Sequence, residues 1–263
     1  MNYKLLFPTY RTRFRFVEDR LHAHKPEGKF VRGLNLGSGE GDYDPMIVEA
    51  CQDLVSCDIN ADDLAFAQGA NAHISNLTYE VQGALDLDFP DNHFDLIVSV
   101  DVLEHVEDPA RMMAEVGRVL APGGLAVITF PQTRFPITYD PINGALGRRA
   151  ISLGAYAFGH DVLVDPDVFV DWTVAAGLEV LSSSNLSGYL VGLAEMYWPG
   201  ILQGLFKANA KNLSEQGEGA GKLRPTSKPP AWVGVTDGLI ALDRGLFRNS
   251  SRSIGKGFIL RKL

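Results

Sequence analysis

The chain has 263 residues, of which 46% are hydrophobic and 21% charged, and this balance is typical of a globular protein with one substantial core. Its net charge of -8 argues against broad binding to nucleic acids or anionic membrane surfaces, because either partner requires a basic face. Cys51 and Cys57 are too few for a disulfide framework or a zinc site, so we expect a reducing, cytoplasmic setting. No apolar run reaches the roughly 18 residues of a membrane span, and we expect no integral membrane association.

An N-terminal helix is expected over residues 10–24, because the proline and glycine that follow His24 end the helical pattern. Its arginines are interleaved with apolar side chains. We interpret them as part of an amphipathic helix whose long charged side chains extend to solvent. These arginines are Arg11, Arg13, Arg15 and Arg20.

Residues 31–41 combine a short apolar run with three glycines at alternate positions, which predicts a strand and a tight turn. A helix is expected to follow, with Asp44 as its N-cap and Pro45 as its first residue. Glycine permits positive φ and lets a ligand approach without meeting a Cβ, so the turn fits a nucleotide-like ligand. A purely structural turn is the alternative, and the G-x-G-x-G spacing differs from the G-x-G-x-x-G of dinucleotide-binding folds. The glycines are Gly37, Gly39 and Gly41.

Strand and helix patterns then alternate along the chain. Asn60 is expected to cap the helix after the second strand, and the Ala-Pro-Gly-Gly turn at 121–124 is expected to end a helix over 109–120. Such alternation predicts parallel strands with right-handed crossovers and helices on both faces of the sheet. The strands expected after the first are 54–59, 77–82, 94–100 and 125–130.

The pattern becomes irregular after the fifth strand. Residues 131–161 are rich in Gly, Pro and aromatic side chains, and we expect an elaborated loop or small helices there. Asp165 and Pro166 then begin a helix that Gly177 ends, and a sixth strand is expected over 178–183.

Residues 185–254 do not continue the alternation, and we predict that they form a helical insertion containing a helix over 239–247. A final strand over 257–261 is expected at the edge of the sheet. The insertion carries an apolar stripe that fits core packing or a lid, a wall of a pocket for a lipophilic acceptor, a dimer face or a membrane-surface helix. We favour a lid and pocket wall, because the stripe lacks a dense basic face. The stripe consists of Tyr189, Met196, Tyr197, Trp198, Leu202 and Phe206.

Asp58 lies at the end of the second strand, 21 residues after Gly37. A carboxylate at this place can accept two hydrogen bonds from a ribose diol. A solvent-facing acid at a strand end is the alternative, and the glycine turn favours the functional interpretation.

Five motifs in this order resemble those of the class I S-adenosylmethionine-dependent methyltransferases, within them the small-molecule type that includes ubiquinone and sterol enzymes. The resemblance covers about residues 30–131, with weaker support from 165–184. The motifs are Leu34–Gly41, Asp58, Phe89–Ser99, Val102–Val106 and Leu120–Leu125.

The resemblance implies a Rossmann-like α/β fold: one domain over residues 1–263, with a seven-stranded, mostly parallel sheet, helices on both faces and an antiparallel last strand. The core would span about 30–184 and 255–263, with the helical insertion over 185–254 between them. S-adenosylmethionine would be the cofactor, and no metal is expected. We expect a small-molecule acceptor as partner and no nucleic acid, and the oligomeric state stays open, with a homodimer included.

Carried over from the family, the three glycines pass under the methionine end of the cofactor, Asp58 holds the ribose, Ile59 packs on the adenine, and Ala84 offers its backbone N–H to the adenine edge. Two positions depart from the family, which has an acid in place of Asn35 and an aspartate in place of Gly83. The full set of expected cofactor-binding residues is Asn35, Gly37, Ser38, Gly39, Gly41, Asp58, Ile59, Ala84, Leu85, Asp86 and Val100. Asp86 is expected to compensate for Gly83, unless that contact is absent.

Three residues are candidates for proton transfer. His105 follows the fourth strand at the edge where open α/β folds bind ligands, although in the family this histidine often only shapes the site. His160 and Tyr139 lie next to aspartates in the irregular segment, where a hydrogen-bonded loop is the alternative. We hypothesise that residues 132–161 recognise the acceptor.

The sequence thus predicts methyl transfer to a small, hydrophobic organic acceptor, with O-methylation favoured over N- or C-methylation. The alternative is a cofactor-binding protein of the same fold without turnover, motivated by Asn35 and Gly83. A nicotinamide-dependent oxidoreductase is disfavoured by the glycine spacing.

Overall fold

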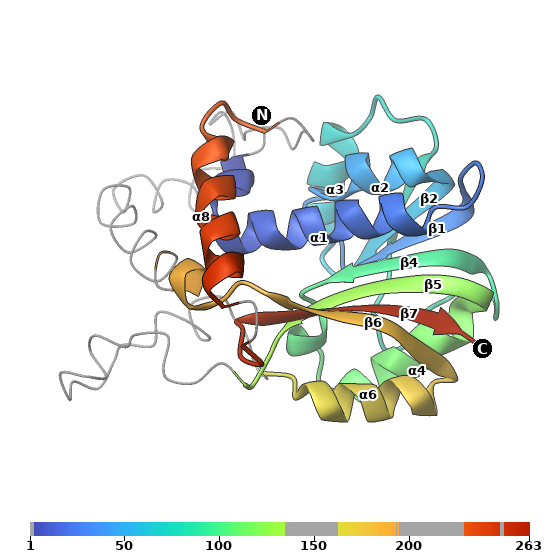
Figure 1. Ribbon diagram of the computed structural model, residues 1–263. Helices are drawn as coiled ribbons and strands as arrows, with labels where there is room; N and C mark the ends of the chain where they lie inside the picture. Colours follow the sequence, from blue (N-terminus) through green and yellow to red (C-terminus); the bar gives the residue numbers. More distant parts are fainter. Residues whose placement is uncertain (1–2, 135–162, 193, 195–228, 248–249) are drawn as a thin grey trace.

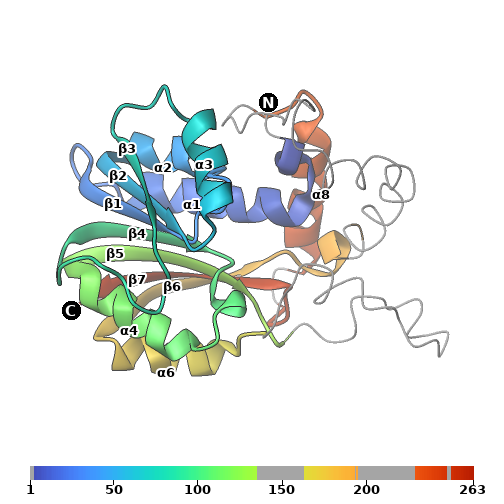
Figure 2. The same cartoon turned by 180° about the vertical axis from the view of Figure 1, so that it is seen from behind.

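The computed structural model describes residues 3–134, 163–192, 194, 229–247 and 250–263. A seven-stranded sheet with the order β3-β2-β1-β4-β5-β7-β6 lies between helices, with α1 and α2 on one face and α4 and α6 on the other (Figures 1 and 2). The strands are β1 (Phe30–Leu36), β2 (Cys51–Asp58), β3 (Leu77–Val81), β4 (Phe94–Val100), β5 (Leu120–Pro131), β6 (Leu178–Leu186) and β7 (Gly255–Lys262). The helices are η1 (Tyr3–Leu6), α1 (Pro8–His24), α2 (Asp44–Ala50), α3 (Ala61–Ala70), η2 (Leu103–His105), α4 (Pro109–Val119), α6 (Pro166–Ala175) and α8 (Val233–Leu246).

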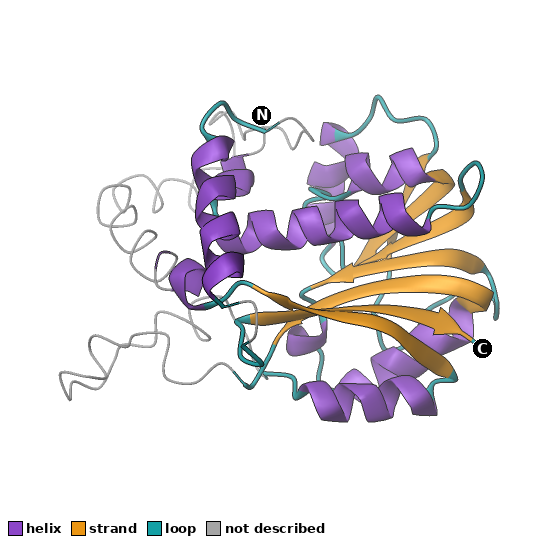
Figure 3. Cartoon of the chain, in the orientation of Figure 1, coloured by secondary structure: helices purple, strands orange, loops and turns teal. Residues whose placement is uncertain are grey.

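The core is divided by the sheet into two layers, which Figure 3 shows as helices on either side of the strands. Successive side chains of a strand point to opposite faces, so β4 serves both layers. Leu96 and Val98 pack with the apolar side chains of α1 and α2, whereas Ile97 packs with those of α4 and α6. All three are fully buried, which explains why β4 is apolar almost throughout.

The predicted α/β class and the parallel pairing of the first five strands are confirmed. β1 pairs in parallel with β2 and β4, β2 with β3, and β4 with β5. The last strand is antiparallel as expected, but its predicted place at the sheet edge is wrong. β7 lies between β5 and β6 and pairs antiparallel with both, which leaves β6 at the edge. Phe258, Ile259 and Leu260 are buried, as an interior strand requires, while Val180 and Leu181 of β6 are more than a third exposed.

Several predicted boundaries differ from the structure. β5 includes the Ala-Pro-Gly-Gly stretch at 121–124, because the β4–β5 register shifts there and Gly123 adopts a φ of 77°. The helix expected over 239–247 begins earlier, at Val233. Asn60 caps α3 as predicted, accepting from the N–H groups of residues 62 and 63. Asp44 is not the N-cap of α2; Tyr43 has that position, and the Asp44 side chain is buried.

The arginines of α1 were expected to extend to solvent, and for Arg13 this expectation is wrong. Arg13 is only 5% exposed and pairs with Asp101 at the end of β4. Arg11 and Arg15 both pair with Asp237 of α8. The helix α1 therefore joins the sheet to a helix of the predicted 185–254 insertion.

The division into one core and one insertion stays a prediction. Within the described part of the chain, no helix is both long and apolar enough to cross a membrane. The expected stripe beyond Tyr189 lies outside the described residues.

Candidate functional site

A cavity of about 1110 Å³ opens at the carboxyl ends of β1, β2 and β4. Open α/β sheets bind ligands at this edge, at the point where the strand order reverses between β1 and β4. Every predicted cofactor-binding residue except Gly41 lines it. These lining residues are Asn35, Gly37, Ser38, Gly39, Asp58, Ile59, Ala84, Leu85, Asp86 and Val100.

The glycine turn after β1 is shaped by two close approaches. Gly37 has a φ of 75°, and an added Cβ would lie 2.3 Å from a methyl group of Val102. Gly41 has a φ of 74°, and its added Cβ would lie 2.6 Å from Oδ2 of Asp44 and 2.8 Å from Ala67. Gly41 is therefore required for packing beneath the turn, which explains why it does not line the cavity.

Asp58 connects the glycine turn to the end of β2. Its Oδ2 accepts a hydrogen bond from the Gly39 N–H at 2.8 Å, and its Oδ1 accepts from the Asn60 N–H at 2.9 Å. The next residue, Ile59, is 78% exposed at the cavity wall, and it lies about 4.0 Å from where a Cβ at Gly83 would be. A fixed carboxylate and an exposed apolar side chain thus stand side by side.

Asn35, at the position where the family has an acid, is hydrogen-bonded to a nearby carboxylate. It is 3% exposed, and its Nδ2 donates to Oδ1 of Asp44 at 2.7 Å. Asp44 is fully buried and also accepts from the hydroxyls of Ser56 and Tyr79, each at 2.8 Å. Burial raises the pKa of the Asp44 carboxyl, and the three hydrogen bonds oppose that rise. A carboxylate thus lies beside residue 35, supplied by α2 instead of β1.

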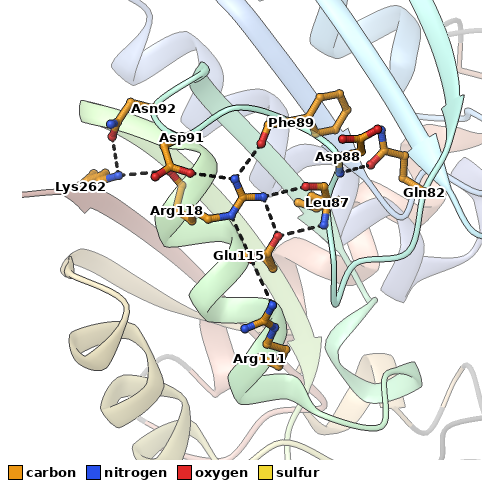
Figure 4. A network of polar contacts seen from close by, with 10 residues as sticks. All are labelled: Gln82, Leu87, Asp88, Phe89, Asp91, Asn92, Arg111, Glu115, Arg118 and Lys262. Atoms are coloured by element: carbon orange, nitrogen blue, oxygen red, sulfur yellow. Dashed lines mark hydrogen bonds and ion pairs between the residues drawn. The ribbon is translucent and has the colours of Figure 1, made fainter.

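The loop between β3 and β4 is held by α4, as Figure 4 shows. Arg118 donates to the carbonyls of Leu87 and Phe89, each at 2.7 Å, and pairs with Glu115. Glu115 in turn accepts from the Leu87 N–H at 2.9 Å, and Arg111 donates to the Leu85 carbonyl at 3.0 Å. The hydrogen bond from Arg118 lowers the pKa of Glu115. These contacts fix the loop that brings Ala84, Leu85 and Asp86 to the cavity.

Three residues at the cavity were not predicted from the sequence: Asp101 at the end of β4, Tyr43 before α2 and Lys4 in η1. Asp101 has a φ of 54°, and Oδ1 accepts from Nε of Arg13 at 2.8 Å and from the Thr129 hydroxyl at 3.0 Å. Asp101 lines the cavity, as do Tyr43 and Lys4. Asp101 follows an apolar strand just as Asp58 does, so the same signal could have identified it. No comparable signal distinguishes Tyr43 or Lys4.

Of the three proton-transfer candidates, His105 is at the cavity wall. Its Nε2 lies 4.0 Å from Oε1 of Glu104, which is fully buried. Burial, and then the charge of Asp101, raise the pKa of Glu104 well above its usual value. His160 and Tyr139 lie outside the described residues, as does most of the predicted acceptor segment 132–161.

Comparisons with known proteins agree with this geometry. Residues 34–128 match the family described as a methyltransferase domain. The chain is 30% identical over 185 residues to the ubiquinone/menaquinone biosynthesis C-methyltransferase UbiE of Shewanella oneidensis, covering 64% of this chain and 74% of that protein. The chain belongs to the class I S-adenosylmethionine-dependent methyltransferases. The predicted family is thereby confirmed.

Two further similarities define how far the likeness extends. A probable S-adenosylmethionine-dependent methyltransferase of Mycolicibacterium smegmatis is 30% identical over 129 residues, covering 49% of this chain and 47% of that protein. The chain thus spans about half the length of that relative. A solved S-adenosylmethionine-dependent methyltransferase from Mesorhizobium loti shares the fold, with a TM-score of 0.55, 18% identity, and coverage of 93% of this chain and 96% of that chain.

S-adenosylmethionine is the cofactor of this methyltransferase family, and the cavity fits it in charge. The cofactor carries a sulfonium and an ammonium, and the wall is rich in carboxylates. Among the described residues that line the cavity, Lys4 is the one lysine or arginine. The lining acids are Glu40, Asp42, Asp58, Asp63, Asp86, Asp101 and Glu107. Such a wall attracts a cationic ligand through the summed field of its charges.

Proposed function

We propose that this chain transfers a methyl group from S-adenosylmethionine to a small, hydrophobic organic acceptor. The single observation that carries the proposal is the cavity at the β1–β4 switch point, where the glycine turn and Asp58 are joined by a 2.8 Å hydrogen bond. That bond places a carboxylate beside a turn that leaves space for a ligand, because a Cβ at Gly39 would meet nothing within 4 Å.

In this proposal, different residues bind the ribose and the adenine of the cofactor. Asp58 accepts hydrogen bonds from the ribose diol, and the exposed Ile59 packs against the adenine. Ala84 and Asp86 meet the adenine edge from the loop that Arg118 and Glu115 hold. Asp86 is the proposed replacement for the missing acid at Gly83, since its N–H donates to the Gly83 carbonyl at 3.3 Å within the same turn.

When bound, S-adenosylmethionine supplies an electrophilic methyl group on its sulfonium. The protein then has to align the acceptor with that group and exclude water, which lowers the barrier by orientation. Oxygen acceptors also need to lose a proton, and His105 is the described candidate at the cavity wall. Replacing His105 by Asn would lower kcat about a hundredfold if the imidazole takes the proton. An unchanged kcat and pH profile would exclude that role.

The acceptor and the atom that is methylated are the finer part of the proposal. O-methylation is our first choice, and residues 132–161 and 185–254 are proposed to recognise the acceptor, with Tyr139 and His160 among them. The UbiE relative is named a C-methyltransferase, so carbon is the atom to test against oxygen. A screen of metabolite extracts with methyl-labelled donor, followed by mass spectrometry of the labelled product, identifies both.

A cofactor-binding protein without turnover is the second candidate. It is favoured by Gly83, which provides no side chain at the adenine edge, and by Asn35, whose amide is engaged by Asp44. Transfer of label from methyl-labelled S-adenosylmethionine separates the two candidates, and calorimetric titration with S-adenosylhomocysteine tests the binding that both require. Both candidates require binding well below about 1 mM, whereas only the enzyme transfers label. Failure to bind at that concentration would reject both.

A further inference from the structure

Tyr43 is a buried residue of the cavity wall whose ring is well packed but whose hydroxyl has no hydrogen-bond partner among the described residues. Its ring packs against Tyr10 and Phe14, with centroids 5.5 Å from each. The residue is 8% exposed. A buried hydroxyl without a partner is destabilising, and such groups in native proteins usually have a ligand or a water as partner.

The neighbouring acid does not satisfy this hydroxyl. Asp101 lies close enough for its charge to act on Tyr43, but its carboxylate is bound by Arg13 and Thr129. Burial raises the pKa of Tyr43 well above its usual value, so the phenol keeps its proton at neutral pH. The Tyr43 hydroxyl can therefore donate a hydrogen bond to a ligand in the cavity.

Two more donors lie along the same glycine turn. The hydroxyl of Ser38 is also buried and has no partner among the described residues. Lys4 of η1 reaches the turn, where its Nζ pairs with Glu40 at 3.1 Å and also with Asp42. By pairing with these acids, Lys4 reduces the negative charge at this end of the cavity.

We propose that Tyr43, Ser38 and Lys4 form a subsite for the carboxylate of the cofactor's amino-acid arm. This inference rests on the proposed binding of S-adenosylmethionine. Two neutral donors suit a carboxylate, which accepts hydrogen bonds only, and hydrogen bonds to a charged group are the stronger kind. In a wall with several acids, a carboxylate needs such a place, and the side chain of Lys4 keeps Glu40 and Asp42 from repelling it.

The test compares two ligands that differ in this one group. S-adenosylhomocysteine has the carboxylate, and its decarboxylated analogue S-adenosyl-3-thiopropylamine keeps the ammonium but lacks it. Isothermal titration of the full chain should show that Tyr43→Phe weakens S-adenosylhomocysteine binding about tenfold. The same variant should bind the decarboxylated analogue as the unchanged protein does.

Tyr10→Phe is the matched control, because Tyr10 belongs to the same aromatic cluster but does not line the cavity. It should leave both affinities unchanged. Ser38→Ala provides a second variant that keeps the ring cluster intact, and we expect the same selective loss. Thermal unfolding of each variant verifies that it is folded.

Lys4→Met should also weaken S-adenosylhomocysteine selectively, and this loss should shrink as salt is added, because Lys4 is about half exposed. The loss in Tyr43→Phe should persist at high salt. Equal weakening of both ligands, or no weakening in either hydroxyl variant, would overturn the subsite while leaving the proposed function intact. If the unchanged protein binds neither ligand, the proposed function fails and the subsite with it.

Discussion

The two sides of the cavity are held by different physical means. On the turn side, formed by residues 35–44 and 101–104, the organising group is the buried acid Asp44, which accepts from Asn35, Ser56 and Tyr79, and a second acid, Glu104, is also buried. On the loop side, formed by residues 82–93 and α4, the organising group is Arg118, whose side chain is 31% exposed. Charges inside the protein have strong effects and resist salt, whereas charges near water are screened. The turn side should therefore be the rigid half of the site and the loop side the adjustable half.

The largest effect should come from Asp44, since its removal breaks the turn side at its centre. Asp44→Ala leaves the donors of Asn35, Ser56 and Tyr79 without their shared acceptor in a buried place. We expect a loss of about 3 kcal/mol in the free energy of unfolding, because each buried unsatisfied group costs about 1–3 kcal/mol. Urea denaturation measures the loss at low and high salt.

Asp44→Asn is the matched control, because it keeps the shape and one acceptor oxygen. It should cost about half as much as Asp44→Ala or less. A loss below about 1 kcal/mol in the alanine variant would contradict the view that this acid organises the turn side.

The second prediction concerns Glu104 and the pH dependence of the free energy of unfolding. Its folded pKa is raised above the unfolded value, so the folded state holds a proton that the unfolded state loses near pH 4.5. The stability from this group is complete below the unfolded pKa and falls as pH rises toward the folded pKa, by up to about 1.4 kcal/mol per pH unit. Glu104→Gln removes the titration, so its stability relative to the unchanged protein should increase from pH 5 to pH 8.

Urea unfolding at several pH values measures the free energy of unfolding of Glu104→Gln and of the unchanged protein. A constant difference between Glu104→Gln and the unchanged protein across that range would show that Glu104 does not titrate in this way.

The strands and the glycine turn that form the site could be predicted from the sequence, because local residue patterns determine them. Apolar runs, the glycine turn and Asp58 specify a parallel sheet and the ends of its strands, and the cavity lies there. The order of the last two strands was missed, because Phe258 and Leu260 indicate a buried strand without stating which neighbours bury it. Pairing between distant strands is decided by the whole sheet, and short apolar runs carry little information on it.

The polar half of the site could not be predicted for a related reason. Asp44 looked like a helix cap because Pro45 follows it, but Asn35, Ser56 and Tyr79 come from three different strands and meet it only in the folded chain. Arg13 looked like a surface residue of an amphipathic helix, and its partner Asp101 is 88 residues away. Buried polar contacts of this kind leave no periodic signal in the sequence.

The smallest effect on stability should come from Arg118, and it sharpens the contrast between the two sides. Arg118→Met removes donors from the Leu87 and Phe89 carbonyls and from Glu115. The Arg118 side chain is 31% exposed, and the buried Glu115 keeps the Leu87 N–H and Arg111 as partners, so we expect a loss of only about 1 kcal/mol, and less at high salt. Because the loop carries Ala84 and Asp86 to the cavity, affinity for S-adenosylhomocysteine should nevertheless fall several-fold.

Arg261→Met is the control, because it breaks the exposed pair with Glu179 at the edge of the sheet. It should change neither the free energy of unfolding nor the free energy of binding by more than about 0.5 kcal/mol. A large, salt-independent loss of stability in Arg118→Met would mean that the loop side is held as rigidly as the turn side, because only contacts shielded from solvent resist added salt.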